Sequence, residues 1–199
     1  MRVLQNILAF LILALVAQSS IAQTTDNKSR FVFTNEPSVF IDGTSTVHDW
    51  TCDVKKYTGS FSSGAKGATT PLAIESGTFS VAIDDIDCGK GAMNSKMKDA
   101  LGGNKATNVM FVLTSAKLVP TTGAAFSAEL TGALKMAGVT KPIVLIATGQ
   151  TLADNQVQIE GSVDVVMSDF DIDPPTAMLG MLKTGDKVTI RFNVVARPQ

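Results

Sequence analysis

The chain has 199 residues, 18% of them charged, and its 17 basic and 18 acidic residues give a formal net charge of −1. So balanced a charge argues against a nucleic-acid partner, which a strongly basic surface would favour. After the apolar run at 3–17, no apolar run approaches the ~20 residues that a membrane-spanning helix needs. We therefore expect no stable membrane anchor.

The first 22 residues have the pattern of a cleaved export signal. Met1-Arg2 is a short basic start, residues 3–17 are almost wholly apolar, and Ser20-Ile21-Ala22 supplies small residues at positions −3 and −1 of a cleavage site. We therefore expect residues 1–22 to be a signal peptide. The remaining residues, 23–199, then form one domain that is periplasmic or secreted.

Alternation of apolar and polar residues predicts strands along most of this domain. Two segments show it most clearly, with apolar residues at Phe126, Ala128, Leu130, Leu134 and Met136 in the first and at Val157, Ile159, Val163 and Val165 in the second. The predicted strands cover residues 30–34, 39–42, 46–58, 71–86, 109–118, 125–136, 139–152, 156–167 and 187–196.

Two short helices are expected between these strands. The first covers residues 92–101, where Met93, Met97 and Leu101 lie on one apolar stripe. The second begins with Asp173 as the N-cap and Pro174 in the first turn, carries the apolar residues Met178, Met181 and Leu182, and ends by Gly185. Both helices would offer methionine side chains to the sheet, and this placement suits a flexible lid.

These elements predict an all-β protein. Many antiparallel strands, each with one apolar face, most simply avoid unpaired edges by closing into an eight-stranded antiparallel barrel, here with two short helices near the cavity mouth. A two-sheet sandwich is the alternative. Gly77, Gly132 and Gly161 fall on inward-facing positions. They either leave room inside the barrel or mark bends in its strands.

The two cysteines, Cys52 and Cys88, are an even pair in a chain expected to be exported. In an oxidising compartment such a pair forms a disulfide, and we expect one here. Two buried thiols are the alternative.

Several short motifs follow one another over nearly the whole mature chain. They are Gly43-Thr44-Ser45 with His48-Asp49-Trp50, then Met93 and Met97, then Leu134 with Gly138-Val139-Thr140-Lys141-Pro142, and finally Ser168-Asp169-Phe170 with Ile172 and Pro174-Pro175. In this order and spacing they resemble the YceI-like domain. The resemblance implies a lipocalin-like barrel that holds a long polyisoprenoid chain in an elongated cavity, without an established catalytic activity.

On this basis we expect a ligand-binding cavity for an isoprenoid or other long-chain lipid, with no cofactor and no metal. The expected lining residues are Phe79, Val81, Ile83, Phe126, Leu130, Leu134, Ile159, Val163, Phe170 and Phe192, with Met93, Met97, Leu101, Met178 and Leu182 near the mouth. Plain core packing explains each of these residues equally well. A non-enzymatic interaction module with a filled core is therefore the alternative function, and the sequence leaves a homodimer open.

No catalytic residue is expected. The only histidine, His48, lies four residues from Cys52, which on one strand corresponds to ~13 Å and is too far for proton transfer. Asp169, Asp171 and Asp173 imitate the start of a calcium loop, but Pro174 and Gly180 stand where that loop needs glycine and glutamate.

Overall fold

The computed structural model describes residues 28–35, 39–64, 73–103 and 107–199. The expected signal peptide, residues 1–22, lies outside the described residues. In the described ranges no helix combines the length and the apolar character that crossing a membrane requires.

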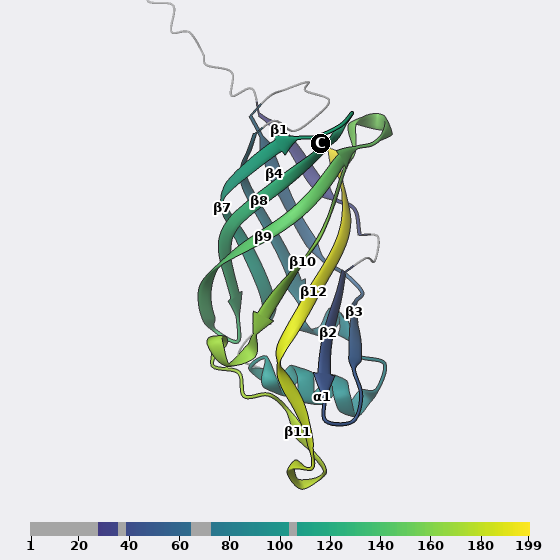
Figure 1. The fold of residues 1–199 in the computed structure, drawn as a ribbon, viewed down its shortest axis with the longest axis vertical. Helices are drawn as coiled ribbons and strands as arrows, with labels where there is room; N and C mark the ends of the chain where they lie inside the picture. The colour runs from purple at the N-terminus through teal and green to yellow at the C-terminus, as the bar shows by residue number, and fades with distance from the viewer. Residues whose placement is uncertain (1–27, 36–38, 65–72, 104–106) are drawn as a thin grey trace, which may run out of the picture.

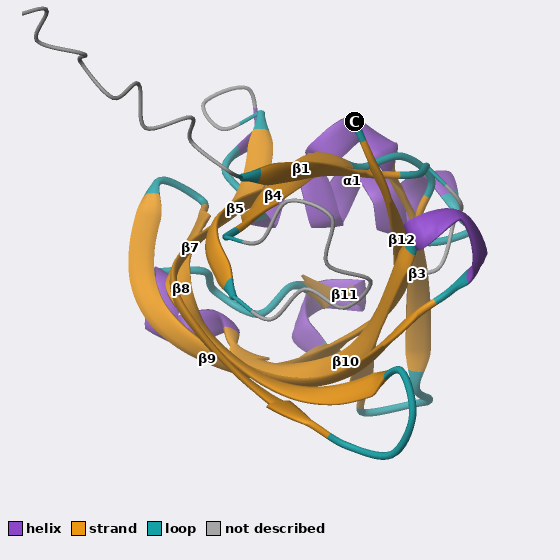
Figure 2. Cartoon of the chain, turned by 90° about the horizontal axis from the view of Figure 1, so that it is seen from above, coloured by secondary structure: helices purple, strands orange, loops and turns teal. Residues whose placement is uncertain are grey.

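Eight strands form a closed antiparallel barrel (Figures 1 and 2). In their order around the ring they are β1 (Ser29–Phe33), β4 (Thr58–Ser63), β5 (Ile74–Ala82), β7 (Asn108–Pro120), β8 (Ala125–Met136), β9 (Val139–Thr151), β10 (Val157–Val166) and β12 (Leu182–Pro198). The ring closes because β1 pairs with β4 on one side and with β12 on the other. The predicted barrel is confirmed, and the sandwich alternative is wrong.

A short ribbon extends the barrel at one end, where β12 also pairs with β2 (Val39–Ser45). β2 pairs in turn with β3 (Trp50–Val54), and β3 pairs with β6 (Ile86–Asp87). The remaining two-residue strand, β11 (Thr176–Ala177), pairs with the start of β12. Short 3₁₀ turns connect the strands at η1 (Ile83–Asp85), η3 (Ala153–Asn155), η4 (Met167–Phe170) and η5 (Met178–Gly180).

The long strand expected over residues 46–58 is two strands in the structure. β3 ends at Val54 and β4 begins at Thr58, so the chain leaves the ribbon there and enters the barrel beside β1. Two hydrogen bonds hold the connection: the Lys55 N–H donates to the Asp85 carbonyl (2.7 Å) and the Tyr57 N–H donates to Asn35 Oδ1 (3.1 Å). The alternation breaks at this corner: the buried residues Cys52 and Val54 are followed by two exposed lysines, and burial resumes with the other parity at Tyr57 and Phe61.

The first predicted helix is present as α1 (Gly91–Ala100), but the second is wrong. Residues 176–183 form a hairpin in which Thr176 pairs with Lys183 and Ala177 with Leu182. Met178 and Leu179 at its turn have φ angles of 51° and 55°, in the left-handed region, which a right-handed helix excludes. The hairpin projects at the lower end of the molecule, below α1 (Figure 1).

Strand β8 has the bounds and the facing that the sequence predicts, and β9 ends one residue earlier than predicted. Met136 pairs with Val139 across the two-residue turn Ala137-Gly138, whose φ angles of 51° and 86° are those of a tight hairpin turn. Along β8 the even-numbered residues from Phe126 to Met136 are buried, while Val144 and Ile146 on β9 face outward, 51% and 61% exposed. The inner face of this hairpin forms part of the barrel wall.

Candidate functional site

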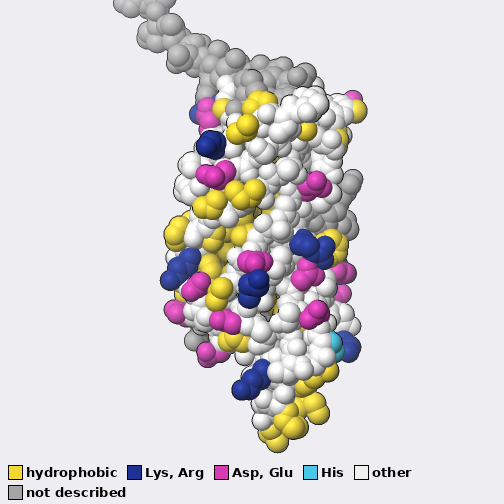
Figure 3. Space-filling view, in the orientation of Figure 1, with side chains coloured by type: hydrophobic (Ala, Val, Ile, Leu, Met, Phe, Trp, Pro, Cys, Tyr) yellow, Lys and Arg dark blue, Asp and Glu magenta, His cyan; other side chains and the backbone are white. Residues whose placement is uncertain are grey.

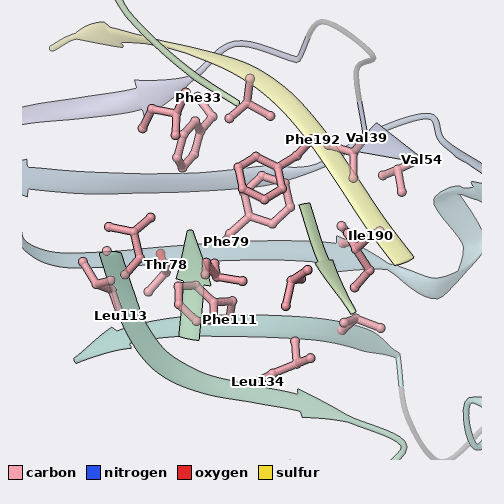
Figure 4. A pocket seen from close by; sticks show the side chains of 18 of the residues that line it. Phe33, Val39, Val54, Thr78, Phe79, Phe111, Leu113, Leu134, Ile190 and Phe192 are labelled. Atoms are coloured by element: carbon pink, nitrogen blue, oxygen red, sulfur yellow. The ribbon is translucent and has the colours of Figure 1, made fainter. Parts of the chain in front are cut away.

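The interior of the barrel is hollow. A cavity of about 180 Å³, here called the inner cavity, is lined by 24 residues, among which only Ser60 and Thr78 have polar side chains. Figure 4 shows phenylalanine rings converging on it from several strands. The apolar lining residues are Phe33, Val39, Ile41, Val54, Phe61, Ile74, Phe79, Val81, Ile86, Val109, Phe111, Leu113, Leu130, Leu134, Ile143, Leu145, Ile159, Val163, Ile190, Phe192 and Val194, with Gly77.

Aromatic rings lie over glycines on neighbouring strands around this cavity. Phe192 is the direct cross-strand partner of Gly161, and Phe61 is the partner of Gly77. A side chain at Gly132 would overlap the ring of Phe111. Because the rings of Phe192 and Phe111 use the space above a glycine, they cover the barrel wall instead of filling the centre, whereas a Cβ at Gly77 would approach Phe61 only at its Cβ atom. The inward glycines therefore permit close approach; of the three, only Gly132 has an irregular register beside it.

Aromatic contacts fix one side of the inner cavity. The ring of Phe33 packs edge-on against Phe79 with centroids 5.5 Å apart, and Phe31 stacks on Phe61 at 4.8 Å. Tyr57 stacks on the other side of the group against Phe79 at 5.0 Å. Such pairs add to the stabilisation that burial alone provides. These contacts stabilise the wall formed by β1, β4 and β5 on the side of the cavity where the rings meet.

A second, larger cavity of about 400 Å³ lies next to the first, and we call it the outer cavity. Residues from α1, from the β2–β3 turn and from the β11–β12 hairpin surround it. The two cavities share the four lining residues Ile41, Ile86, Val109 and Ile190. The shared residues define a junction through which the apolar interior continues toward the end of the barrel that carries α1.

The disulfide between Cys52 and Cys88 holds one wall of the outer cavity. It joins β3 to the segment that leads into α1, as expected for an even pair of cysteines. The Cys88 N–H donates to Asn94 Oδ1 (2.7 Å), and Asn94 Nδ2 donates to Asp87 Oδ1 (3.0 Å). The bond from Asn94, with one from the Gly89 N–H, keeps the pKa of Asp87 below its ordinary value.

Helix α1 places its apolar side on the outer cavity and its polar side on the rim. Met93, Met97 and Leu101 line the cavity and pack against the buried core. Lys96 Nζ donates to the Thr176 carbonyl (2.7 Å) and so connects α1 to the β11–β12 hairpin. The charged or ionisable lining residues are Lys90, Lys96, Lys183 and His48, and none of the described residues that line the cavity is acidic.

The geometry around His48 does not form a nucleophile and base pair. Its ring Nδ1 lies 2.7 Å from the Asp49 carbonyl, and its backbone N–H donates to Ser45 Oγ (3.2 Å). Cys52 is in the disulfide and offers no thiol. Over the described ranges, no three His, Cys, Asp or Glu side chains are grouped to hold a metal ion.

Most of the residues predicted from the sequence lie on the walls of the two cavities. Phe79, Val81, Leu130, Leu134, Ile159, Val163 and Phe192 line the inner cavity. Met93, Met97, Leu101 and Leu182 line the outer one.

Four predicted lining residues, Ile83, Phe126, Phe170 and Met178, line neither cavity. Ile83 begins η1, where the chain has left β5, and Phe170 is buried in η4 against the neighbouring core cluster. Phe126 is 2% exposed because its ring packs over Gly149, its cross-strand partner. Met178 is 64% exposed at the hairpin turn and so is not part of a lid.

Several lining residues were missed from the sequence, chiefly the aromatic residues Phe33, Phe61, Phe111 and Trp50 and the junction residue Ile190. A usable signal exists for some of them. Phe61 and Trp50 each fall opposite a glycine, Gly77 and Gly43, once the strands are paired. Without a register the sequence does not show which aromatic residue faces which glycine.

Comparisons with known proteins agree with this architecture. Residues 24–196 match the model of the YceI-like domain, whereas no curated protein gives a significant match. The solved structures that resemble the chain include BcnA of Burkholderia cenocepacia, with 17% identity and a TM-score of 0.62 over 80% of this chain and 95% of that one.

Two further solved structures share the fold. A polyisoprenoid binding domain from Saccharophagus degradans, implicated in plant cell wall breakdown, has 11% identity and a TM-score of 0.62 over 85% of this chain and 98% of that one. The YceI protein of Campylobacter jejuni has 16% identity and a TM-score of 0.56 over 74% and 84%. At these identities the similarity shows the fold alone.

Proposed function

The chain belongs to the YceI-like domain family, and from this premise we propose that it binds a long isoprenoid or a similar amphiphilic lipid and carries or sequesters it outside the cytoplasm. The observation that carries the proposal is the inner cavity, whose wall is apolar except at Ser60 and Thr78. A hydrocarbon guest loses no hydrogen bonds on entering such a space. The polyisoprenoid binding domain from Saccharophagus degradans, which shares the fold, adds support.

Binding in this proposal depends on burial of the tail. Each buried CH₂ contributes ~0.8 kcal/mol, so ten of them give roughly 8 kcal/mol before the costs of association. The tail would lie in the inner cavity and pass the junction at Val109 and Ile190 into the outer cavity. Neither an ion pair nor a cofactor is needed for useful affinity, and the arrangement requires no catalytic group.

Native mass spectrometry of protein purified from its own host tests the proposal. We expect a bound lipid mass, and prenyl alcohols of increasing length added to stripped protein should bind with increasing affinity until the tail fills both cavities. Bare polypeptide from the host together with affinity that does not depend on chain length would contradict the proposal. It would favour the interaction module.

Export is part of the proposal and has its own measurement. Residues 1–22 have the pattern of a signal peptide. The intact mass of protein recovered from outside the cytoplasm should correspond to a chain that begins at Gln23. A chain that retains Met1 and stays in the cytoplasm would contradict this part and leave lipid binding unaffected.

A further inference from the structure

The end of the molecule next to the outer cavity carries a projecting cluster of exposed apolar side chains. Met178, Leu179 and Met181 at the hairpin turn are 64%, 104% and 70% exposed, and Val47 in the β2–β3 turn is 65% exposed. We call these four residues the apolar tip. Thr46 Oγ1 donates to the Met181 carbonyl (3.3 Å), which holds the turn against the hairpin. Figure 3 shows the tip as a yellow patch at the lower end of the molecule.

The backbone of the tip is unusual for the residues it carries. Met178, Leu179 and Gly180 have φ angles of 51°, 55° and 88°, three successive residues in the left-handed region. Glycine or asparagine occupies such positions with less strain than methionine or leucine. These large side chains stabilise no core, because they are exposed. Strain and exposure together indicate that the tip is used for an interaction.

Positive charge surrounds the tip. Lys90, Lys96 and Lys183 line the outer cavity beside it, and Lys183 comes shortly after Met181, with Leu182 between them on β12. Neither Lys90 nor Lys183 forms an ion pair within the part of the chain that the structure describes. Blue and cyan side chains lie just above the yellow patch in Figure 3.

The acidic residues of this end of the chain lie outside the cavity lining. Asp49 follows His48 in the β2–β3 turn, and Asp173 precedes β11; both are exposed. Asp99 on α1 and Asp186 on β12 also lie outside the lining, so among the described residues the outer cavity is lined by three lysines and by no acid. The balance favours an anionic surface as the partner.

We propose that the apolar tip inserts into the interfacial region of an anionic phospholipid bilayer while the lysines contact its headgroups. A small apolar protrusion next to basic side chains is the composition of interfacial membrane anchors. Four residues on a narrow projection are too few for a protein interface, which needs ~800 Å² per partner. Docking of this kind is reversible and places the outer cavity against the membrane, so the lipid tail enters without crossing water.

Cosedimentation with vesicles of phosphatidylglycerol and phosphatidylethanolamine tests the proposal. The double variant Leu179→Gln, Met181→Gln should lose at least tenfold in vesicle affinity. The matched control is Val144→Gln, Ile146→Gln on the outer wall of β9, where two apolar side chains are similarly exposed. The control should stay within twofold of the wild type, and because all four residues are exposed, both variants should keep the wild-type melting temperature.

The charge component has a separate readout. Lys90→Gln and Lys183→Gln should each weaken binding to the anionic vesicles about fivefold at low salt. They should leave binding to purely zwitterionic vesicles unchanged. Equal losses on both kinds of vesicle would contradict a role for the lysines in headgroup contact.

Two outcomes would overturn the proposal. The tip variant and the wall variant would bind vesicles equally well if the tip were not the contact surface. Alternatively, the wild type could be a dimer that the tip variant converts to monomers, with neither protein binding vesicles. That result would show that the tip contacts a second copy of the chain. Uptake of a short-chain fluorescent lipid from solution separates this inference from the proposed function. The tip variant should take up this lipid as the wild type does. A wild type that does not take it up would contradict lipid binding in the cavity, not membrane contact by the tip.

Discussion

Phe192 and Gly161 face each other across β12 and β10, and the ring occupies the space in which a side chain at 161 would lie. A Cβ atom built on Gly161 would be 2.9 Å from Phe192 Cζ and 2.7 Å from the Ile146 carbonyl oxygen. The ring therefore lies close to the sheet. The cavity in the centre of the barrel depends on this close approach, because a ring displaced from the wall would enter the open space.

Substitution of Gly161 by alanine should destabilise the protein by about 1–3 kcal/mol, the usual cost of forcing an extra methyl group into a packed site. Gly77→Ala is the matched control, because a Cβ there meets only Phe61 Cβ at 3.3 Å and otherwise ordinary contacts. It should stay within ~1 kcal/mol of the wild type, since alanine also lowers the entropic cost of ordering glycine. Urea unfolding measures both. Equal losses of unfolding free energy in the two variants would show that the close approach of Phe192 to Gly161 does not determine the cost of the substitution.

Narrowing the junction of the two cavities should shorten the tail that the protein accepts. Val109→Phe places a ring where both cavities are lined, whereas Val112→Phe makes the same change on the opposite face of β7. Val109→Phe should lower the affinity for a long prenyl alcohol at least tenfold, the equivalent of about two buried methylene groups. Short chains that fit the outer cavity should bind as before. Titration of each variant with a long and a short prenyl alcohol measures these affinities. An equal loss of affinity in Val112→Phe would indicate that the substitutions disturb the fold rather than the junction.

Removal of the disulfide should cost about 3–4 kcal/mol on the chain-entropy estimate, because Cys52 and Cys88 are 36 residues apart in sequence. The double variant Cys52→Ser, Cys88→Ser and the reduced wild type should therefore unfold at similarly lower urea concentrations. A reducing agent should have no further effect on the double variant. A reduced wild type as stable as the oxidised one would show that the bridge positions α1 without stabilising the fold.

The pair of Asp42 on β2 and Arg191 on β12 should make stability depend on pH in the acid range. Arg191 donates from Nη2 to Asp42 Oδ1 (3.1 Å) and from Nε to Oδ2, and this bond, helped by Thr51, keeps the pKa of Asp42 below its ordinary value. Because the pKa of Asp42 is lowered in the folded state, the contribution of this ion pair to folding stability is complete above the unfolded pKa, about 3.9. It is lost as the pH falls below that value.

Asp42→Asn should accordingly melt at a lower temperature than the wild type at pH 7, and the difference should narrow below about pH 4. Arg191→Gln removes the same interaction and should follow the same pattern. Thermal melts at both pH values provide the measurement. A difference that is constant between pH 7 and pH 3 would exclude the ion pair as its cause.

The sequence predicts the barrel well because its signal is local and repeated. The alternation in residues 125–136 gives β8 with its observed bounds, and the apolar stripe of Met93, Met97 and Leu101 gives α1 to within one residue. Inward residues on β8 and β10, such as Leu130 and Ile159, follow directly from the same alternation.

Where the prediction fails, the deciding interaction is not local. The spacing of Met178, Met181 and Leu182 fits one face of a helix as well as it fits a hairpin turn, and only the pairing of Ala177 with Leu182 decides between them. Phe126 has the inward parity of a lining residue, yet its position at the end of β8 against Gly149 buries it. Parity shows which side of the sheet a residue faces but not how far along the barrel it lies.

The contact that closes the ring joins segments from opposite ends of the sequence: the Thr34 N–H donates to the Val195 carbonyl (2.7 Å), and the two residues are 161 positions apart. While the polypeptide is being made, β1 is among the first strands to emerge and its partner is the last. A nascent chain that stops short of residue 195 has two sheet edges with unsatisfied backbone groups, the condition in which strands pair with other chains. Closure of the barrel must therefore wait until β12 has been made, and fragments that lack this strand should aggregate.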